Sequence, residues 1–217
     1  MAKTNRGGLP LRHDIERRGL RCGMTEIRSG LPILAFADQA ALERWLAEQP
    51  SKAKGVWIKF AKKGSGITSV SKAEAIDSAL CWGWIDGQLD KYDANSWLIR
   101  FTPRKPRSKW SQINRTRALE LVAQGRVEAA GLAEIEAARR DGRWEAAYAP
   151  ASKAVVPPDL QIALDTNPKA ANFFASLTGA NRYAILYRIG AAKKSETRER
   201  KIKEFVAMLE RGKTIHG

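Results

Sequence analysis

The stretch CWGWIDGQLDKYDANSWLIRFTPRKPRSKW, residues 81–110, constrains the fold more than any other part of the chain. Residues 84–92 and 97–102 are rich in aromatic and branched side chains, and the polar letters DANS separate them. Two such segments joined by a short polar turn predict a β-hairpin. If the strand ends face each other across the turn, Asp90 lies opposite Ile99.

The N-terminal half contains further strand and helix candidates. Residues 33–36 form a short apolar strand, and alternate residues of KGVWIKFAKK share one side of another strand: Val56, Ile58 and Phe60. Asp38 and Ser71 each precede apolar residues at helical spacing, and Ser71 with Glu74 has the spacing of a capping box. This half therefore predicts a small, mainly antiparallel sheet flanked by helices.

The C-terminal half has the apolar periodicity of helices throughout. Its clearest helix is SETRERKIKEFVAMLERG, in which Ser195 is expected to be the N-terminal cap and Gly212 to end the helix. The predicted fold class is therefore α+β, with a small mainly antiparallel sheet flanked by helices and followed by a C-terminal helical subdomain.

Composition shifts along the chain suggest its domain boundaries. Residues 1–23 are rich in Arg and Gly without apolar periodicity, so we expect a disordered tail or an extension from a misassigned start codon, with Met24 as the true start. Residues 24–143 are predicted to form the α+β domain, and residues 159–217 the helical subdomain. The Ala-, Ser- and Pro-containing segment 144–158 is the expected linker.

Several kinds of site are disfavoured by residue type. Only two histidines occur, His13 and His216, both in segments expected to fray, so a histidine-based triad or zinc site is not expected. The cysteines Cys22 and Cys81 have no metal-ligand spacing, and Cys81 is expected to be a small buried hydrophobe. We therefore predict no metal site and no cofactor. No apolar run approaches transmembrane length, and the predicted compartment is the cytoplasm.

The positive charge is concentrated in one segment. The chain has a net charge of +15, and between Arg100 and Arg117 there are seven basic residues and no acidic one. PRKPRSKWS combines arginines, which can bind phosphate or carboxylate through two hydrogen bonds, with the start of a helix. The predicted anion-binding residues are Arg100, Arg104, Arg107, Lys109 and Ser111. The alternative is a solvated basic loop whose arginines pair with the hairpin aspartates.

The same stretch offers two further functional candidates. Trp84 and Trp110 could form an aromatic platform for a ring-bearing ligand, although at least two of its four tryptophans are expected to be core residues. Asp86, next to indoles and before a glycine, could act as a general acid or base. The alternative for Asp86 is a salt bridge to Arg100 or Arg104.

A second basic segment, AAKKSETRERKIK, lies near the C-terminus. Its glutamates occur at helical spacings among the lysines and arginines. We therefore interpret it as a solvated helix face, with charges that offset one another.

Four motifs together resemble a known family. ALCWGWIDGQ, RFTPRKPRSKWSQIN, DGRWEAAY and KSETRERKIKEFVAML are similar to the YdeI/OmpD-associated family of bacterial proteins, often labelled bacteriocin-protection proteins. The resemblance is expected to run from about Met24 to Lys213 and implies a cytosolic or envelope-stress-related α+β protein. It supplies no catalytic residues, because the protection label describes a phenotype.

Three functions remain open from the sequence. The first is a stress or bacteriocin-protection protein that binds an anionic small molecule or peptide at the basic loop after the hairpin. The second is a nucleic-acid-binding protein that uses residues 100–117, which predicts steep salt dependence. The third is a hydrolase-like or transferase-like enzyme with Asp86 as acid or base. The sequence does not define an oligomeric state.

Overall fold

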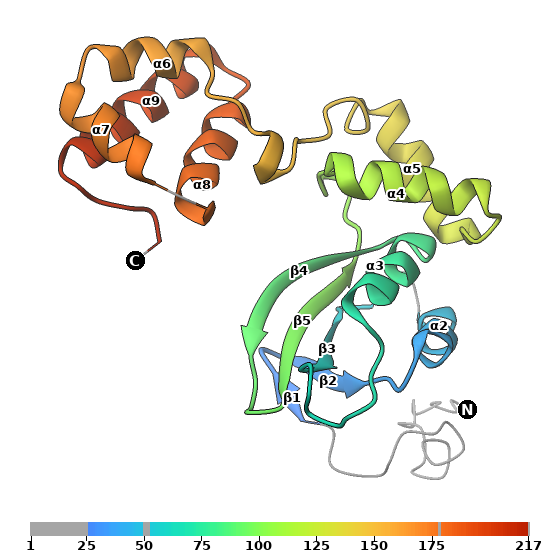
Figure 1. Cartoon of the computed structure of the whole chain (residues 1–217). Coiled ribbons are helices and arrows are strands. Elements are labelled where there is room, and N and C mark those ends of the chain that lie inside the picture. Colours follow the sequence, from blue (N-terminus) through green and yellow to red (C-terminus); the bar gives the residue numbers. More distant parts are fainter. Residues whose placement is uncertain (1–25, 50–52, 178, 217) are drawn as a thin grey trace, which may run out of the picture. The chain divides into compact units, whose positions relative to one another are not determined.

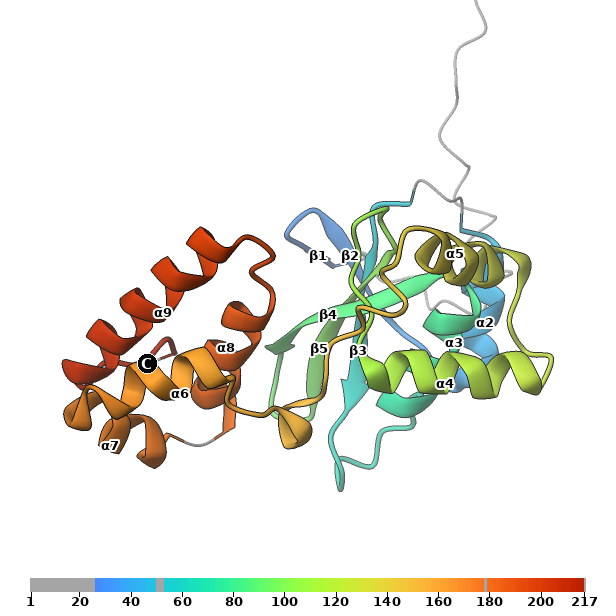
Figure 2. The ribbon, with the colours of Figure 1, turned by 90° about the horizontal axis from the view of Figure 1, so that it is seen from above.

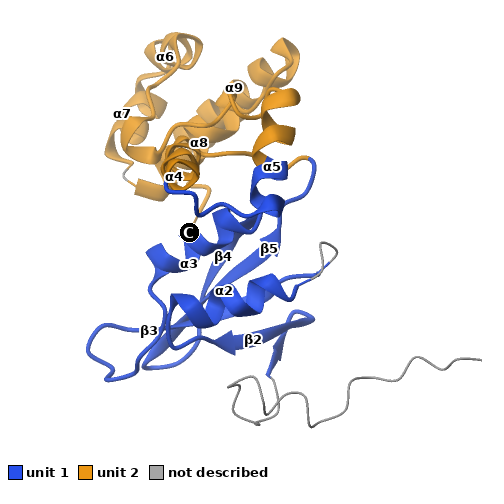
Figure 3. Ribbon diagram, turned by 90° about the vertical axis from the view of Figure 1, so that its right-hand side faces the viewer, with its two compact units in different colours: residues 1–106, 124–134 blue, residues 107–123, 135–217 orange. Residues whose placement is uncertain are grey.

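The computed structural model describes residues 26–49, 53–177 and 179–216. The chain divides into two compact units (Figure 3). Unit 1 comprises the described residues up to 106 together with 124–134, and unit 2 comprises 107–123 and 135–217. The sequence prediction placed the first boundary at 143–144 instead. The predicted tail and the proposed start at Met24 lie outside the described residues.

Unit 1 contains a five-stranded sheet in the order β1-β2-β3-β5-β4 (Figure 1). The strands are β1 (Ile27–Arg28), β2 (Leu31–Ala35), β3 (Val56–Ala61), β4 (Trp84–Lys91) and β5 (Ser96–Pro103). Only β2 and β3 run parallel, joined by α2 (Gln39–Ala47), and every other neighbouring pair is antiparallel. The predicted α+β class with a mainly antiparallel sheet is confirmed.

One face of the sheet packs against α2 and α3 (Lys72–Cys81). The predicted alternation in β3 is confirmed, because Val56, Ile58 and Phe60 all lie in this core with buried leucines of α2. The helix starts also follow the sequence. Asp38 Oδ1 accepts from the N–H of Ala41, and Ser71 forms a complete capping box with Glu74.

The hairpin of β4 and β5 forms as predicted, but its register differs by one residue at the position tested. Asp90 lies opposite Leu98, and Leu89 lies opposite Ile99. The register shifts between Asp86 and Leu89, so the ladder carries an irregularity at Gly87 and Gln88. Asp90 lies on the turn side of this irregularity, so its one-residue error arises at the turn itself, where Lys91 and not Tyr92 lies opposite Trp97.

A glycine allows α5 (Ala129–Arg140) to begin close to the end of α3. A Cβ atom on Gly131 would lie 2.3 Å from the carbonyl oxygen of Cys81 and 2.8 Å from that of Leu80. The N–H of Glu128 donates to the same Cys81 carbonyl at 3.0 Å. Residues 124–134 are therefore packed directly on the end of α3, which explains why they belong to unit 1.

Unit 2 is helical, and Figure 2 shows its last four helices grouped together. They are α6 (Pro158–Asp165), α7 (Pro168–Ser176), α8 (Gly179–Gly190) and α9 (Ser195–Glu210). Their shared core includes fully buried Leu160, Ile185, Ile189 and Leu209. The predicted helical character of the C-terminal half is therefore present in the structure.

Unit 2 also includes α4 (Gln112–Ala123) and the segment predicted to be a linker. Trp144 is buried against Trp110, with ring centroids 4.8 Å apart. The N–H of Tyr148 donates to the carbonyl of Trp110, and the N–H of Gln112 donates to the carbonyl of Tyr148. Residues 144–148 are thus packed and hydrogen-bonded within the unit, as buried indoles and paired backbone groups require.

Candidate anion-binding site

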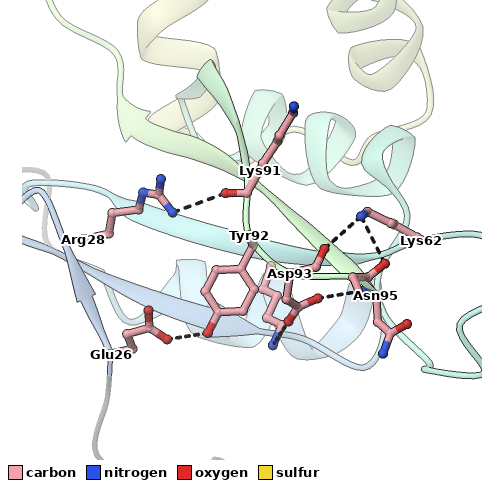
Figure 4. A network of polar contacts seen from close by, with 9 residues as sticks. Glu26, Arg28, Lys62, Lys91, Tyr92, Asp93 and Asn95 are labelled. Atoms are coloured by element: carbon pink, nitrogen blue, oxygen red, sulfur yellow. Dashed lines mark hydrogen bonds and ion pairs between the residues drawn. The ribbon is translucent and has the colours of Figure 1, made fainter.

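Two of the hairpin aspartates, Asp90 and Asp93, pair with cations other than the arginines that follow the hairpin. Asp90 Oδ2 lies 2.6 Å from Arg28 Nη2, and Asp93 Oδ2 lies 3.5 Å from Lys59 Nζ. Figure 4 shows the contacts around the turn, where Arg28 also donates to the carbonyl of Lys91, Tyr92 donates to Glu26, and Lys62 donates to the carbonyls of Asp93 and Ala94. These contacts brace the turn of the hairpin.

Tyr92 illustrates the electrostatics of this brace. The hydrogen bond to the Glu26 carboxylate, with some desolvation, raises the pKa of the Tyr92 phenol, so it stays protonated and remains a donor. Its ring also lies 4.3 Å from the Lys59 ammonium. Of the charged residues that Figure 4 labels, Arg28 and Lys91 belong to strands, whereas Glu26 and Lys62 are hydrogen-bonded to residues of the turn.

Asp86 lies half-buried in β4 opposite Phe101. Among the residues that the structure describes, no ion pair joins its carboxylate to Arg100 or Arg104, so the salt-bridge alternative has no support from the geometry. No histidine, tyrosine or lysine that would orient it for proton transfer is hydrogen-bonded to it within the described ranges. Its acid or base role stays a prediction without a geometric partner.

The five residues predicted to bind an anion fall into different units. Arg100 and Arg104 belong to unit 1, whereas Arg107, Lys109 and Ser111 belong to unit 2. Arg100 is exposed, but Arg104 is only 6% exposed and presents almost no surface to a ligand. The Ser111 hydroxyl accepts from the N–H of Asn114 at 3.1 Å, so it caps the start of α4.

The two tryptophans predicted to form a stacking platform lie in packed interiors. Trp84 is 4% exposed and contacts Trp45 edge-to-face, and Trp110 is 1% exposed and contacts Trp144 in the same way. Stacking on a ligand needs an accessible ring face, which neither indole offers. The expectation that at least two tryptophans of this stretch are core residues is confirmed.

Cys81 also behaves as expected from the sequence. It is a free thiol, 2% exposed, at the end of α3. Burial raises the pKa of the Cys81 thiol to about 11, only partly offset by the positive charge of Arg126. The thiolate that nucleophilic chemistry needs is therefore scarce at neutral pH. The described residues also contain no group of three His, Cys, Asp or Glu side chains arranged for a metal ion.

A basic cavity lies within unit 2, where α8 ends and α9 begins. Its volume is about 410 Å³, in the range of sites for small ligands. We call it the α8–α9 cavity, and its lining residues are Tyr187, Arg188, Ala191, Ala192, Lys193, Lys194, Thr197 and Lys201. Four of these carry a positive charge and none carries a negative charge. Its walls therefore favour an anion.

The cations of the α8–α9 cavity are not neutralised by neighbouring side chains. Arg188, Lys193, Lys194 and Lys201 form no ion pair or side-chain hydrogen bond with any part of the chain that the structure describes. The acidic residues nearby are engaged elsewhere: Glu199 accepts from Ser195, Glu204 pairs with Arg200, and Asp159 binds Arg198. The segment is largely exposed and Arg200 pairs with Glu204 at helical spacing, as expected, but the charges of the cations that line the cavity are not offset in this way.

The start of α9 adds to the positive character of the cavity. The predicted cap by Ser195 is wrong, because Ser195 is the first helical residue and its hydroxyl donates to Glu199 Oε1 at 2.7 Å. Lys194 occupies the cap position and makes no side-chain capping bond. The N–H groups of the first turn are thus uncapped by side chains, next to lining residues Lys194 and Thr197.

Tyr187 connects the cavity to the basic segment singled out in the sequence. It lines the cavity, and the ammonium of Lys109 lies 5.0 Å from the centre of its ring. Tyr148 contacts the same ring edge-to-face at 5.1 Å, and Tyr183 lies at 5.9 Å. Lys109 is thus the one predicted anion-binding residue that the described structure connects with the cavity wall.

The comparisons assign different family models to the two parts of the chain. Residues 153–212 match the family described as Bacteriocin-protection, YdeI or OmpD-Associated. The predicted resemblance is therefore confirmed for the C-terminal part, which contains the α8–α9 cavity, and not over the full expected range. Residues 34–134 match a Domain of unknown function (DUF8412), and this match ends where unit 1 ends.

Neither the curated proteins nor the solved structures include a match to this chain. No helix in the described part of the chain has the length and apolarity needed to cross a lipid bilayer. Function must therefore be argued from the site itself.

Proposed function

We propose that this protein binds a small anionic molecule in the α8–α9 cavity of unit 2. The single observation that supports the proposal is the lining of this cavity, where four basic side chains surround a hollow of about 410 Å³ without a carboxylate among them. Like charges held together repel one another, and a bound anion relieves that repulsion.

The arrangement of the lining residues suits a compact charged group. Arg188 approaches from α8, Lys193 and Lys194 from the connection, and Lys201 from the second turn of α9. Thr197 is half-buried beside them, and its hydroxyl has no partner among the described residues. A phosphate or carboxylate would accept hydrogen bonds from these donors and from the first-turn N–H groups.

The geometry favours this function over the two alternatives. Nucleic-acid binding through residues 100–117 would need an extended row of accessible cations. Arg115 instead donates to the carbonyl of Trp144, Arg117 pairs with Glu120, and Arg104 is buried. An enzyme using Asp86 would need an orienting partner for that carboxylate.

The test is calorimetric titration of the full chain with inorganic pyrophosphate at about 0.15 M salt, where exposed charges are screened. We expect saturable one-to-one binding. Replacing Lys193, Lys194 and Lys201 together with glutamine should weaken it about tenfold or more, because charge-assisted hydrogen bonds are lost.

A matched control removes the same charge outside the cavity. Lys203, Arg211 and Lys213 are exposed residues of the same C-terminal segment that do not line it. Their combined replacement with glutamine should leave pyrophosphate affinity within about twofold, since only long-range screened interactions change. Equal weakening by both triple variants, or no binding by the wild type, would overturn the proposal.

A further inference from the structure

We infer that the anion bound in the α8–α9 cavity carries a flat ring beside two or more phosphate groups, as a nucleoside diphosphate does. This inference rests on the proposed function and specifies the class of its ligand. It follows from the division of the cavity lining into a cationic part and an apolar part. An inorganic anion would contact only the cationic part.

The charge of the cationic part sets the number of anionic groups. Arg188, Lys193, Lys194 and Lys201 supply four positive charges, so a single carboxylate would neutralise only one of them. A diphosphate ester carries a charge of about −3 near neutral pH, because its terminal group ionises a second time near pH 6. Its several oxygens also match the number of donors around the hollow.

The apolar part of the lining is one aromatic ring with two small side chains. Tyr187 is half-buried, and Ala191 and Ala192 beside it occupy little volume. A ring on the ligand would gain contact with Tyr187 in the space that the alanines leave. Aromatic side chains next to cations are the combination that recognises a base together with its phosphates.

Tyr187 is held in place before any ligand arrives. Tyr148, Tyr183 and the ammonium of Lys109 all contact its ring, and both tyrosines are anchored in turn. The Tyr183 hydroxyl donates to the carbonyl of Ala149 at 2.9 Å, and the backbone of Tyr148 is bonded to Trp110 and Gln112. A wall fixed in this way loses little conformational entropy when a ligand ring packs against it.

Two sources could present this chemistry: a free nucleotide or the end of a single-stranded nucleic acid. The cavity is a hollow within one pair of helices, and its volume of about 410 Å³ suits one nucleotide. Further nucleotides would have to find contacts outside it. We therefore assign the free nucleotide as the ligand and use an oligonucleotide as the competing probe.

The experiment compares adenosine diphosphate, inorganic pyrophosphate and adenosine on the full chain by titration calorimetry at fixed ionic strength. We expect adenosine diphosphate to bind about tenfold more tightly than pyrophosphate, and adenosine to bind most weakly. Tyr187→Leu should weaken adenosine diphosphate about tenfold while pyrophosphate affinity changes less than about twofold. Tyr187→Phe keeps the ring and should keep both affinities.

The outcomes separate this inference from the proposed function. If pyrophosphate binds as tightly as adenosine diphosphate and Tyr187→Leu affects both equally, the inference of a ligand ring against Tyr187 is wrong, while the proposed binding of an anion is kept. If neither probe binds the wild type, both the proposed function and this inference are wrong. A single-stranded oligonucleotide that binds more tightly as it lengthens would overturn the free-nucleotide assignment. If Tyr187→Leu does not fold, saturation-transfer NMR on the wild type decides, since a ring against Tyr187 requires stronger transfer to base than to ribose protons.

Discussion

The hairpin turn of unit 1 and the α8–α9 cavity of unit 2 are both rich in basic side chains, yet these side chains play opposite roles. At the turn, Arg28 and Lys59 have carboxylate partners, and Lys62 is bound by two carbonyls. In the cavity, the cations have no such partners within the described residues. The cations of the first region stabilise the hairpin through these contacts, whereas the cations of the second region can bind a ligand.

This difference shows that a glutamate or aspartate close in sequence to a lysine or arginine does not necessarily form an ion pair with it. Arg28 pairs with an aspartate 62 residues away. Glu196, Glu199 and Glu204 lie within a few residues of the cavity lysines, but the latter two bind other side chains and none lines the cavity. An i,i+4 spacing permits an ion pair on a helix, but it contributes only about 0.3–0.5 kcal/mol, so other partners readily displace it.

The comparison assumes that each unit has its own core, and the largest expected effects test this. Ile58 in unit 1 and Ile185 in unit 2 are 1% and 0% exposed. Replacing either with alanine should cost about 3 kcal/mol, because the methyl groups lose their burial and leave a cavity. Hydrogen exchange, read segment by segment, should show lost protection in the unit that carries the substitution.

The control for this test is Ile162→Ala in α6, because the Ile162 side chain is 66% exposed and should contribute about 0.5 kcal/mol or less. Uniform loss of protection in both units after either buried substitution would show that they share one cooperative core, and the comparison between them would then fail.

A smaller effect separates paired from unpaired cations within unit 2. Arg198 binds Asp159 through two bonds of 2.5 and 2.9 Å, and this hydrogen-bonded pairing lowers the pKa of the Asp159 carboxyl. A lowered pKa in the folded state means that the stabilisation is present above the ordinary aspartate pKa of about 3.9 and is lost as pH falls further. The pair is partly exposed, so about 1 kcal/mol is an upper limit.

Urea unfolding of the wild type and of Asp159→Asn at pH 7, 4 and 3 measures this contribution. The wild type should be the more stable at pH 7, and the difference should shrink toward zero at pH 3. A difference that stays constant with pH would rule out the ion pair as its cause.

The smallest expected effect has opposite signs in the two regions. Lys201→Gln removes repulsion in the cavity and should raise the free energy of unfolding by about 0.3–0.5 kcal/mol at low salt. Lys62→Gln removes the hydrogen bonds to the turn carbonyls and should lower it by about 0.5–1 kcal/mol. Chemical denaturation at two salt concentrations checks both, because only the repulsion is screened. If both substitutions changed the free energy of unfolding in the same direction, the contrast between the cavity and the hairpin turn would not hold.

The sequence predicted those parts of the fold that local patterns determine. The alternation of Val56, Ile58 and Phe60 and the capping box at Ser71 both follow from neighbours a few residues apart. The hairpin register was missed at the turn, where Lys91 and not Tyr92 lies opposite Trp97, and a second shift follows near Gly87. A glycine within a strand pattern is the cue that could have indicated a bulge.

The unit boundary and the cavity depend on contacts between distant residues. Trp110 and Trp144 pack together across 34 positions of sequence, which no local composition change reveals. The cavity lysines were visible as KKSETRERK, but their interspersed glutamates suggested mutual neutralisation. Which carboxylate turns toward which cation depends on tertiary packing, as the Asp159–Arg198 pair demonstrates.

The packing of residues 124–134 on the end of α3, which Gly131 allows, bears on the order in which the two units can form during synthesis. Because residues 124–134 complete unit 1 after 107–123 have joined unit 2, the backbone passes between the units three times. A ribosome must therefore release residue 134 before unit 1 is complete, and by then it has already exposed part of unit 2. Because each unit is built from two separate stretches of the chain, no single cut of the backbone separates them.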